Sequence, residues 1–361
     1  MLGVVSLTNE QLNDPVALTR ALVDTESVSG DEERIADLVE TALTGREHLR
    51  VFRDGNVVFA RTELGRDKRI MLAGHLDTVP LNENFPSHTE GDTMYGCGTS
   101  DMKSGTAIAL HLAATLTDPA HDLSFVFYDC EEVDSERNGL NKASVHRPEW
   151  LAADFAFLLE PTLGVVEAGC QGTMRAEVSL VGKRAHSARS WLGDNAIHAA
   201  GAVLRKLEDY RARTVDIDGC QYREGLNAVG ITGGVAGNVV PDRCTVTVNF
   251  RFAPDRSLDD AQQHLEDVFA GFDVRVTDRG PAAMPGLNAP AAADFLRRVG
   301  HEPRAKLGWT DVARFAQLGV PAVNFGPGDP NLAHTKNEHV SCSRIMDCCE
   351  TLRDYLSKGS R

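Results

Sequence analysis

Short apolar runs alternate with stretches of helical spacing in the first half of the chain. Residues 69–73, 123–128 and 155–159 are short and mostly apolar, which predicts strands. Residues 14–43 and 102–116 have the spacing of helices, and a Ser-Val-Ser-Gly run at residues 27–30 interrupts the first of them. Strands and helices in alternation predict an α/β domain.

The pattern changes between residue 173 and about residue 281. Strands are expected over residues 174–181, 226–232, 244–252 and 273–277, and helices over residues 195–210 and 258–270. In the third of these strands, Val246, Val248 and Phe250 share one face. The order β-α-β-β-α-β predicts a four-stranded sheet backed by two helices.

The last part of the chain returns to the first pattern, with helices expected over residues 291–299 and 311–317 and a strand over residues 320–325. We therefore predict an α/β fold in which a mixed-sheet domain, residues 1–172 and 284–361, carries an inserted α+β domain, residues 173–283. A chain of 361 residues is about twice the usual length of one domain, which agrees with two.

The composition of the chain excludes some classes of partner and of function. A formal net charge of −15 argues against nucleic acid or an anionic membrane as a partner, so an anionic substrate would need a local cluster of cations. No apolar run approaches the ~20 residues that cross a bilayer, and the N-terminus lacks the basic-then-apolar order of a secretory signal. The eight cysteines show no disulfide framework. We expect a cytoplasmic enzyme with reduced thiols.

Residues that can bind metal follow the predicted strands. His75 and Asp77 lie two apart at the end of the first strand, so both side chains point to the same side. There, one can bind a metal while the other accepts the imidazole N–H. Asp101 lies in a glycine-bracketed turn that opens a helix, where a carboxylate can bridge two cations.

Two glutamates, Glu131 and Glu132, close the second strand, where carboxylates are unfavourable unless ligated or paired. Adjacent residues of an extended segment point to opposite sides, which suits one metal ligand and one general base. Glu160 follows the third strand, and His334 lies in a polar loop after the last one. Nitrogen and oxygen ligands of this kind suit zinc, and a shared carboxylate sets two metals roughly 3.5–4 Å apart.

Each of these residues also has an ordinary structural explanation. A buried His75 with satisfied hydrogen bonds, a helix N-cap at Ser100 or Asp101, and two solvated loop glutamates are the alternatives. The combination is far more specific than its parts.

Over essentially its whole length the chain resembles the dinuclear zinc metallopeptidase family that includes carboxypeptidase G, aminoacylase and acetylornithine deacetylase. The run Gly-His-Leu-Asp-Thr-Val-Pro at residues 74–80 is similar to the first family signature, and Gly-Thr-Ser-Asp-Met-Lys-Ser-Gly at residues 98–105 to the second. The Glu131–Glu132 pair, Glu160 before Pro161, and His334 follow in the family order.

This resemblance implies a two-zinc amide hydrolase, in which Co²⁺ or Mn²⁺ can take the place of zinc. It implies that Asp101 bridges the metals, that Glu131 is the general base and that Asp77 supports the first histidine. The remaining implied ligands are His75 and Glu160 for one metal, and Glu132 and His334 for the other.

For the inserted domain, the resemblance implies a lid that also forms a homodimer. His186 would reach the partner subunit's active site and stabilise the oxyanion, although taken alone it is an ordinary surface-loop histidine. Asn238 and Arg251 match family positions that hold substrate.

The sequences of residues 127–132, 186–195 and 308–314 are similar to those of family members that remove succinate from N-succinyl-L,L-2,6-diaminopimelate. The expected substrate is therefore a small anionic N-acyl amino acid, and the products would serve diaminopimelate and lysine biosynthesis. One departure affects the substrate contacts. Many such members have Arg-Arg-Gly-Ser where this chain has Cys170-Gln171-Gly172-Thr173, so an arginine that usually contacts the substrate carboxylate is missing, although Thr173 can still donate through its hydroxyl.

Three alternatives stay open at this point. The same chemistry can act on another N-acyl amino acid such as acetylornithine, or on a dipeptide. An enzyme with a single zinc would keep every ligand. A non-catalytic binding module is expected to have other residues at some of the ligand positions or at Glu131, and the sequence shows no such replacement.

Overall fold

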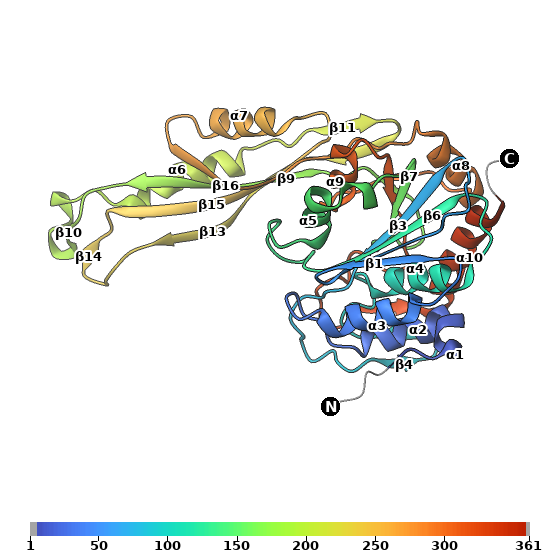
Figure 1. The fold of residues 1–361 in the computed structure, drawn as a ribbon. Coiled ribbons are helices and arrows are strands. Elements are labelled where there is room, and N and C mark those ends of the chain that lie inside the picture. The colour runs from blue at the N-terminus through green and yellow to red at the C-terminus, as the bar shows by residue number, and fades with distance from the viewer. Residues whose placement is uncertain (1–5, 359–361) are drawn as a thin grey trace. The chain divides into compact units, whose positions relative to one another are not determined.

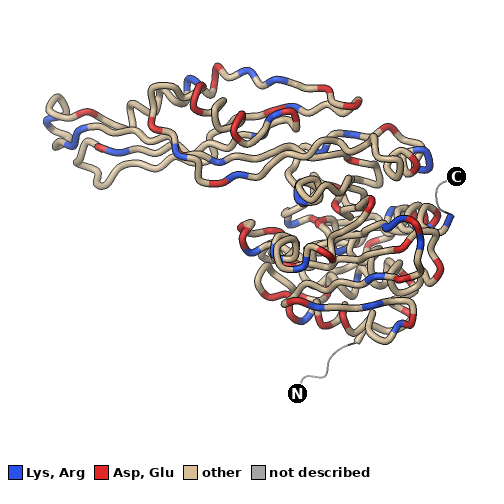
Figure 2. Tube along the Cα trace, turned by 45° about the horizontal axis from the view of Figure 1, so that its top comes forward, with Lys and Arg blue, Asp and Glu red and all other residues tan. Residues whose placement is uncertain are grey.

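The computed structural model describes residues 6–358, and the chain divides into two compact units (Figure 1). The first unit comprises Met1–Ala168, Gly286–Arg304 and Arg314–Arg361, and the second comprises Gly169–Pro285 and Ala305–Ala313. Acidic and basic residues are interspersed along both units (Figure 2).

An eight-stranded mixed sheet runs through the first unit in the order β1-β2-β6-β3-β7-β18-β8-β17. Its strands are β1 (Arg50–Asp54), β2 (Val57–Arg61), β3 (Arg69–His75), β6 (Asp122–Tyr128), β7 (Phe155–Leu158), β8 (Glu167–Ala168), β17 (Arg304–Ala305) and β18 (Ala322–Asn324). Strand β3 is parallel to β6 and β7, and β7 is parallel to β18, so these four strands end at the same edge. In open α/β sheets that edge is where ligands bind.

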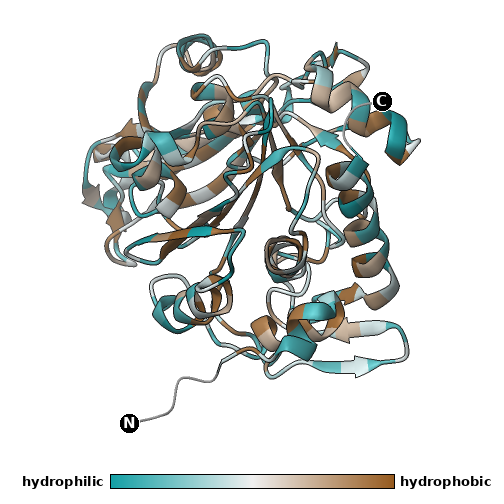
Figure 3. Cartoon of the chain, turned by 45° about the vertical axis from the view of Figure 1, so that its right-hand side comes forward, coloured by the Kyte–Doolittle hydropathy of each residue, from teal (hydrophilic) through white to brown (hydrophobic). Residues whose placement is uncertain are grey.

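Helices cover the sheet because alternate strand residues are large and apolar. Ile70, Leu72, Phe125 and Phe157 are fully buried in one continuous core with the helices of one face. These helices are α2 (Pro15–Val23), α3 (Glu33–Leu43), α4 (Lys103–Thr115), α8 (Pro290–Val299) and α10 (Cys342–Lys358). Figure 3 shows hydrophobic residues along the central strands and a mixture of hydrophobic and hydrophilic residues along the helices.

Smaller elements complete the first unit. Helix α1 (Asn9–Asn13) precedes α2, whose N-cap Asp14 accepts from the backbone amides of Val16 and Ala17. The stacked rings of Phe59 and Trp150, 5.2 Å apart, pack together beside α5 (Gly139–His146) and the short helix η1 (Pro148–Trp150). The first unit also contains a three-stranded sheet of β4 (His88–Glu90), β5 (Thr93–Tyr95) and β19 (His339–Ser341). The short helix α9 (Val312–Gln317) begins in the last segment of the second unit and ends in the first unit.

The second unit is a four-stranded antiparallel sheet in the order β13-β15-β9-β16, with two helices on one face. Its main elements are β9 (Gly172–Val181), α6 (Ala196–Glu208), β13 (Gly225–Gly233), β15 (Arg243–Phe252), α7 (Leu258–Val268) and β16 (Asp273–Gly280). Val246, Val248 and Phe250 lie in its core, as their alternation predicted. Two short pairs, β10 (Ala185–His186) with β14 (Val239–Val240) and β11 (Thr214–Ile217) with β12 (Cys220–Arg223), are attached to it, and the 3-10 helix η2 (Ser187–Leu192) follows β10.

The predicted α/β class with a mixed sheet is confirmed. The main elements of the second unit follow one another in the order β9, α6, β13, β15, α7 and β16. The elements missed by the sequence reading include the β1–β2 and β11–β12 hairpins and the helices α1, α5 and α10. All eight cysteines are free thiols. Within residues 6–358 the structure contains no helix with the length and apolarity required to span a bilayer.

Candidate metal centre

The polar residues singled out in the first unit lie where parallel strands end. His75 is the last residue of β3, and Asp77 follows it. Glu131 and Glu132 follow β6, and Glu160 follows β7. Because β3, β6 and β7 are parallel neighbours, these side chains start from one edge of the sheet.

Asp101 reaches this edge because helix α4 packs unusually close to the strands. A Cβ on Gly105 would lie 1.9 Å from the carbonyl oxygen of Leu159, so only glycine fits there. The hydroxyl of Thr106 donates to the carbonyl of His75 at 2.8 Å. These contacts fix the first turn of α4, and with it Asp101, against the ends of β3 and β7.

The carboxylate of Asp101 lies between two imidazoles. Its Oδ1 is 3.2 Å from His75 Nε2, and its Oδ2 is 3.4 Å from His334 Nε2. His334 Nε2 is also 2.8 Å from Glu132 Oε1. One carboxylate that turns a separate oxygen to each of two histidines has the geometry expected of a bridging metal ligand.

Asp77 supports both His75 and the turn after β6. The backbone carbonyl and Oδ1 of Asp77 lie 3.1 and 3.4 Å from His75 Nδ1, which leaves Nε2 for the centre. Its carboxylate also accepts from the backbone amides of Glu131 at 3.0 Å and Glu132 at 3.1 Å. Burial alone would raise the pKa of Asp77, but the hydrogen bond and charge of His75, with the other donors, lower it to about 2.

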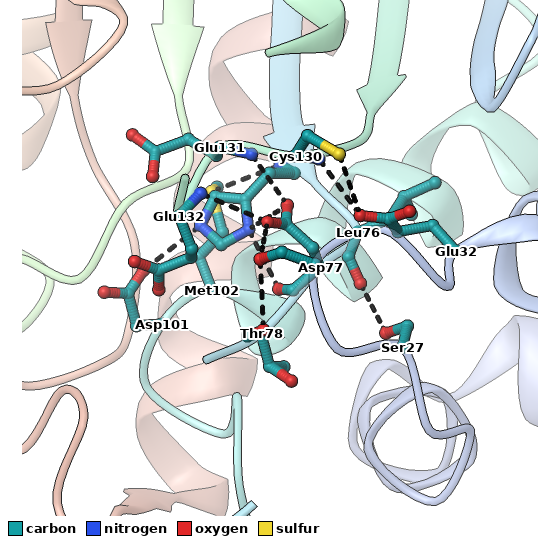
Figure 4. A network of polar contacts seen from close by, with 12 residues as sticks. Ser27, Glu32, Leu76, Asp77, Thr78, Asp101, Met102, Cys130, Glu131 and Glu132 are labelled. Carbon is teal, nitrogen blue, oxygen red and sulfur yellow. Dashed lines mark hydrogen bonds and ion pairs between the residues drawn. The ribbon is translucent and has the colours of Figure 1, made fainter. Parts of the chain in front are cut away.

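The two adjacent glutamates point in different directions from the backbone (Figure 4). Glu132 turns toward Asp101, whereas the carboxylate of Glu131 lies apart from that pair. Glu160, the remaining predicted ligand, is buried in the loop after β7, with 5% of its surface exposed.

The donors concentrate negative charge. Hydrogen bonds to Asp101 and Glu132 raise the pKa of His334 to about 10. Burial opposes protonation of His75, yet its contacts with Asp101 and Asp77 still raise its pKa well above the ordinary value. A site that favours protonated imidazoles also favours a bound cation.

The donor set fits a divalent metal. His75, Asp101 and Glu132 offer atoms that all lie within 4.8 Å of one another. Imidazole nitrogen and carboxylate oxygen are common zinc ligands, and the two oxygens of Asp101 face different histidines.

A second group with metal-binding atoms is Glu32, Asp129 and Cys130. Glu32 Oε1 already accepts from the backbone amides of Gly30 at 2.7 Å and Cys130 at 3.2 Å. The guanidinium of Arg137 lies 3.9 Å from Cys130 Sγ. This group therefore holds the turn before Glu131 rather than presenting an open site.

Two predicted residues of the second unit lie close together. His186 on β10 pairs with Val239 on β14, and the amide of Ser187 donates to the carbonyl of Asn238 at 2.8 Å. His186 is exposed, and its Nδ1 accepts from the amide of Ala188 at 3.0 Å.

The other two, Thr173 and Arg251, are cross-strand partners on β9 and β15. Arg251 Nε donates to Asn249 Oδ1 at 3.1 Å, and Asn249 Nδ2 donates to Thr173 Oγ1 at 3.2 Å. Burial and the charge of nearby Arg175 lower the pKa of Arg251. Both effects disfavour the charged guanidinium, so an anionic ligand beside it would stabilise the charge.

Three supporting residues were missed by the sequence reading. Ser29 donates to Asp77 Oδ2 at 2.7 Å, Glu32 holds the amide of Cys130, and Glu338 accepts from the backbone around Asp101. The run at residues 27–30 was interpreted only as a helix break, and Glu338 follows His334 by four residues without any pattern of its own.

The fold and the donor set define a metal-dependent hydrolase with its centre at the carboxyl edge of a mixed sheet. Residues 71–358 match the model of peptidase family M20/M25/M40, and the chain belongs to this family. The predictions of family and of a metal-dependent amide hydrolase are confirmed.

Two relatives are similar over nearly their whole length. A protein of Mycobacterium tuberculosis with the provisional name succinyl-diaminopimelate desuccinylase is 59% identical over 95% of this chain and 98% of its own. The succinyl-diaminopimelate desuccinylase of Corynebacterium glutamicum is 49% identical over 96% and 97%. Among solved structures, a dinuclear metal-binding peptidase of the M20 family from Bacillus subtilis has the same fold, with a TM-score of 0.68 at 16% identity over 94% of this chain and 95% of that one.

Proposed function

We propose that the protein hydrolyses N-succinyl-L,L-2,6-diaminopimelate to succinate and L,L-2,6-diaminopimelate with two zinc ions per subunit. The position of Asp101 between His75 and His334 carries the two-metal part of this proposal. The substrate rests on the two desuccinylases, which are 59% and 49% identical to this chain.

We assign five residues as ligands. Asp101 would bridge the two ions, with His75 and Glu160 on one and Glu132 and His334 on the other. The distances within His75, Asp101, Glu132 and His334 support this assignment. For Glu160 the support is its burial directly after β7, beside the strand that ends in His75. Co²⁺ or Mn²⁺ would satisfy the same donors.

When bound, the two cations would polarise the amide carbonyl and make a water molecule acidic enough to lose a proton near neutral pH. Glu131 is the proposed base. It would accept that proton as the water attacks, and would then deliver it to the leaving amine nitrogen. Asp77 holds the backbone of Glu131 and the ring of His75, so the base and a ligand share one support.

We propose that Arg251, Asn238 and Thr173 bind the substrate. Thr173 and Arg251 form one polar patch with Asn249 on the face of the sheet opposite the apolar core. A guanidinium there can hold a substrate carboxylate through paired hydrogen bonds. Arg175, next to Arg251, adds a second positive charge in a chain that has Gln171 where many desuccinylases have arginine.

The proposed role of residues 173–283 is that of a lid and dimerisation domain in a homodimer. His186 lies beyond one end of β9, whereas Thr173 and Arg251 lie at the other end. The ten residues of β9 span roughly 30 Å, so one subunit's His186 is remote from its own Arg251. In a homodimer the other subunit would supply His186 to hold the developing oxyanion.

The surface of the second unit supports such a dimer. Strand β13 is an edge strand that carries Val229 and Ile231 with 60% and 53% of their surfaces exposed. Ile197 and Leu204 of α6 are 40% and 43% exposed. Long edge strands with exposed apolar side chains pair readily with another chain.

We place the enzyme in the cytoplasm, on the route that forms diaminopimelate and lysine. The test is turnover of N-succinyl-L,L-diaminopimelate beside N-acetylornithine by purified protein with added zinc. Clear preference for the succinyl compound is expected. Preference for N-acetylornithine would keep the metal chemistry and overturn the substrate, and an acetylornithine deacetylase of Myxococcus xanthus is 32% identical over 77% of both chains.

A further inference from the structure

Glu338 is a buried carboxylate that binds the backbone around Asp101. It is 2% exposed and lies immediately before β19, four residues after His334. Its Oε1 accepts from the amides of Ser100 at 2.8 Å and Asp101 at 3.0 Å, and its Oε2 accepts from the amide of Gly98 at 3.1 Å. One side chain therefore satisfies three amides of the segment that carries Asp101.

The segments that carry Glu338 and Asp101 are also joined through other atoms. The amide of Gly96 donates to the carbonyl of Glu338 at 3.1 Å, and the hydroxyl of Ser100 donates to the carbonyl of His339 at 2.9 Å. His339 pairs with Tyr95 between β19 and β5. Only residues 335–337 lie between His334 and the anchored Glu338, so the anchor also limits where His334 can lie.

We propose that Glu338 is a positioning residue for the metal centre, which sets the distance between Asp101 and His334 by fixing both of their segments to each other. This inference rests on the two-metal function proposed above. Glu338 itself offers its oxygens to backbone amides and not to the centre, so it acts through Asp101 and His334.

The physical reason is the geometry of a shared ligand. Asp101 must present one oxygen to each side, and its oxygens now lie 3.2 Å from His75 and 3.4 Å from His334. A small shift of its backbone would bring one oxygen closer to its histidine and move the other oxygen away from the second histidine. Groups that orient ligands in this way typically change metal affinity or activity by about 10–100-fold when removed.

Glu338→Gln is the test variant because it keeps the size of the side chain. Its amide oxygen can still accept from two backbone amides. Its NH₂ group would face the amide of Gly98, and because both are donors that hydrogen bond would be lost. The matched control is Asp122→Asn. Asp122 is also buried and holds the amides of Leu64 and Arg66, but it lies at the start of β6, away from the centre.

The measurement is the zinc affinity of each purified variant by competition with a chelator. The visible spectrum of the Co²⁺-loaded protein is recorded in parallel, because it reports ligand geometry. We expect Glu338→Gln to weaken binding of at least one zinc by about 10–100-fold, to alter the Co²⁺ spectrum, and to lower kcat more than it changes KM. Asp122→Asn should lose stability and keep wild-type affinity and spectrum.

Equal zinc affinity and equal Co²⁺ spectra for Glu338→Gln and the wild type would overturn the positioning role. If Glu338→Gln does not fold, Glu338→Asp is measured in the same way, since a shorter carboxylate cannot reach all three amides. Failure of the wild-type protein to bind two ions would instead contradict the proposed function, so the two failures are distinguishable.

Discussion

The carboxylate of Asp77 accepts a hydrogen bond from the backbone amide of Glu131 at 3.0 Å. Asp77 also contacts Nδ1 of His75, with its backbone carbonyl oxygen at 3.1 Å and its Oδ1 at 3.4 Å. The proposed base and a proposed metal ligand therefore depend on one buried side chain, which is 0% exposed. Changes at Glu131 and at Asp77 should have different consequences for metal and for turnover.

Replacement of the base should separate catalysis from metal binding. Glu131→Gln is expected to keep the zinc content of the wild type and to lower kcat by about 10²–10⁴-fold, because the amide cannot take a proton from water. Zinc is measured by mass spectrometry and kcat by succinate release. The comparison variant is Glu132→Gln, which should lose zinc as well. A near-normal rate for Glu131→Gln would remove Glu131 as the base.

Replacement of the support should affect both properties together. Asp77→Ala leaves the His75 ring without its carboxylate partner and the amides of Glu131 and Glu132 without an acceptor. We expect a loss of about 10–100-fold in zinc affinity or in activity. Ser29→Ala removes only one donor to Asp77, 2.7 Å away, and should have a much smaller effect. Equal effects of the two variants would contradict the assignment of Asp77 as the main support.

Stability at acid pH should depend on Asp122, remote from the centre. Burial would raise the pKa of this carboxyl, but hydrogen bonds from the Leu64 amide, the Thr62 hydroxyl and the Arg66 amide outweigh burial and lower it. A lowered folded-state pKa means that the stabilisation is present above the unfolded pKa of about 3.9 and is lost as pH falls through the folded value.

Asp122→Asn should therefore reduce the free energy of unfolding by about 1–3 kcal/mol at pH 7, since it removes hydrogen bonds to a charged group. The difference between variant and wild type should begin to shrink near pH 4, about where the Asp122 carboxyl of the unfolded chain takes up a proton, and should be lost as the folded carboxylate is protonated at lower pH. Urea denaturation between pH 3 and pH 7 measures both. A difference that stays constant over that range would show that the charge of Asp122 is not responsible.

The sequence was sufficient to place the candidate site residues because strand ends can be recognised from apolar runs. His75, Glu131, Glu132 and Glu160 each follow such a run, and parallel strands bring their ends to one edge. The roles of Glu32 and Glu338 were not predictable in this way. Both act on backbone amides, which every residue carries, so no pattern of side chains marks them.

The missed strands have a similar explanation. In β1 only intermediate and exposed residues occur, so it lacks the apolar run that identified β3 and β6. In the β11–β12 hairpin, exposed and less exposed positions alternate over only four residues in each strand. Pairing with a neighbour, β2 for β1, stabilises such strands, and that tertiary contact is not visible in local hydrophobicity.

The cross-subunit role of His186 predicts complementation between two inactive variants. His186→Ala should lose most activity, by about 10²–10³-fold for a lost oxyanion donor, and Glu131→Gln is inactive for the reason given above. In a mixed dimer, the site with an intact Glu131 belongs to the His186→Ala subunit and receives its histidine from the Glu131→Gln subunit, so one site of the two is complete. Unfolding, mixing and refolding the two variants together should therefore restore activity that neither has alone, and mixing either variant with itself should not. If His186 served its own subunit, every site in the mixed dimer would lack either the base or the histidine, and the mixture would stay inactive.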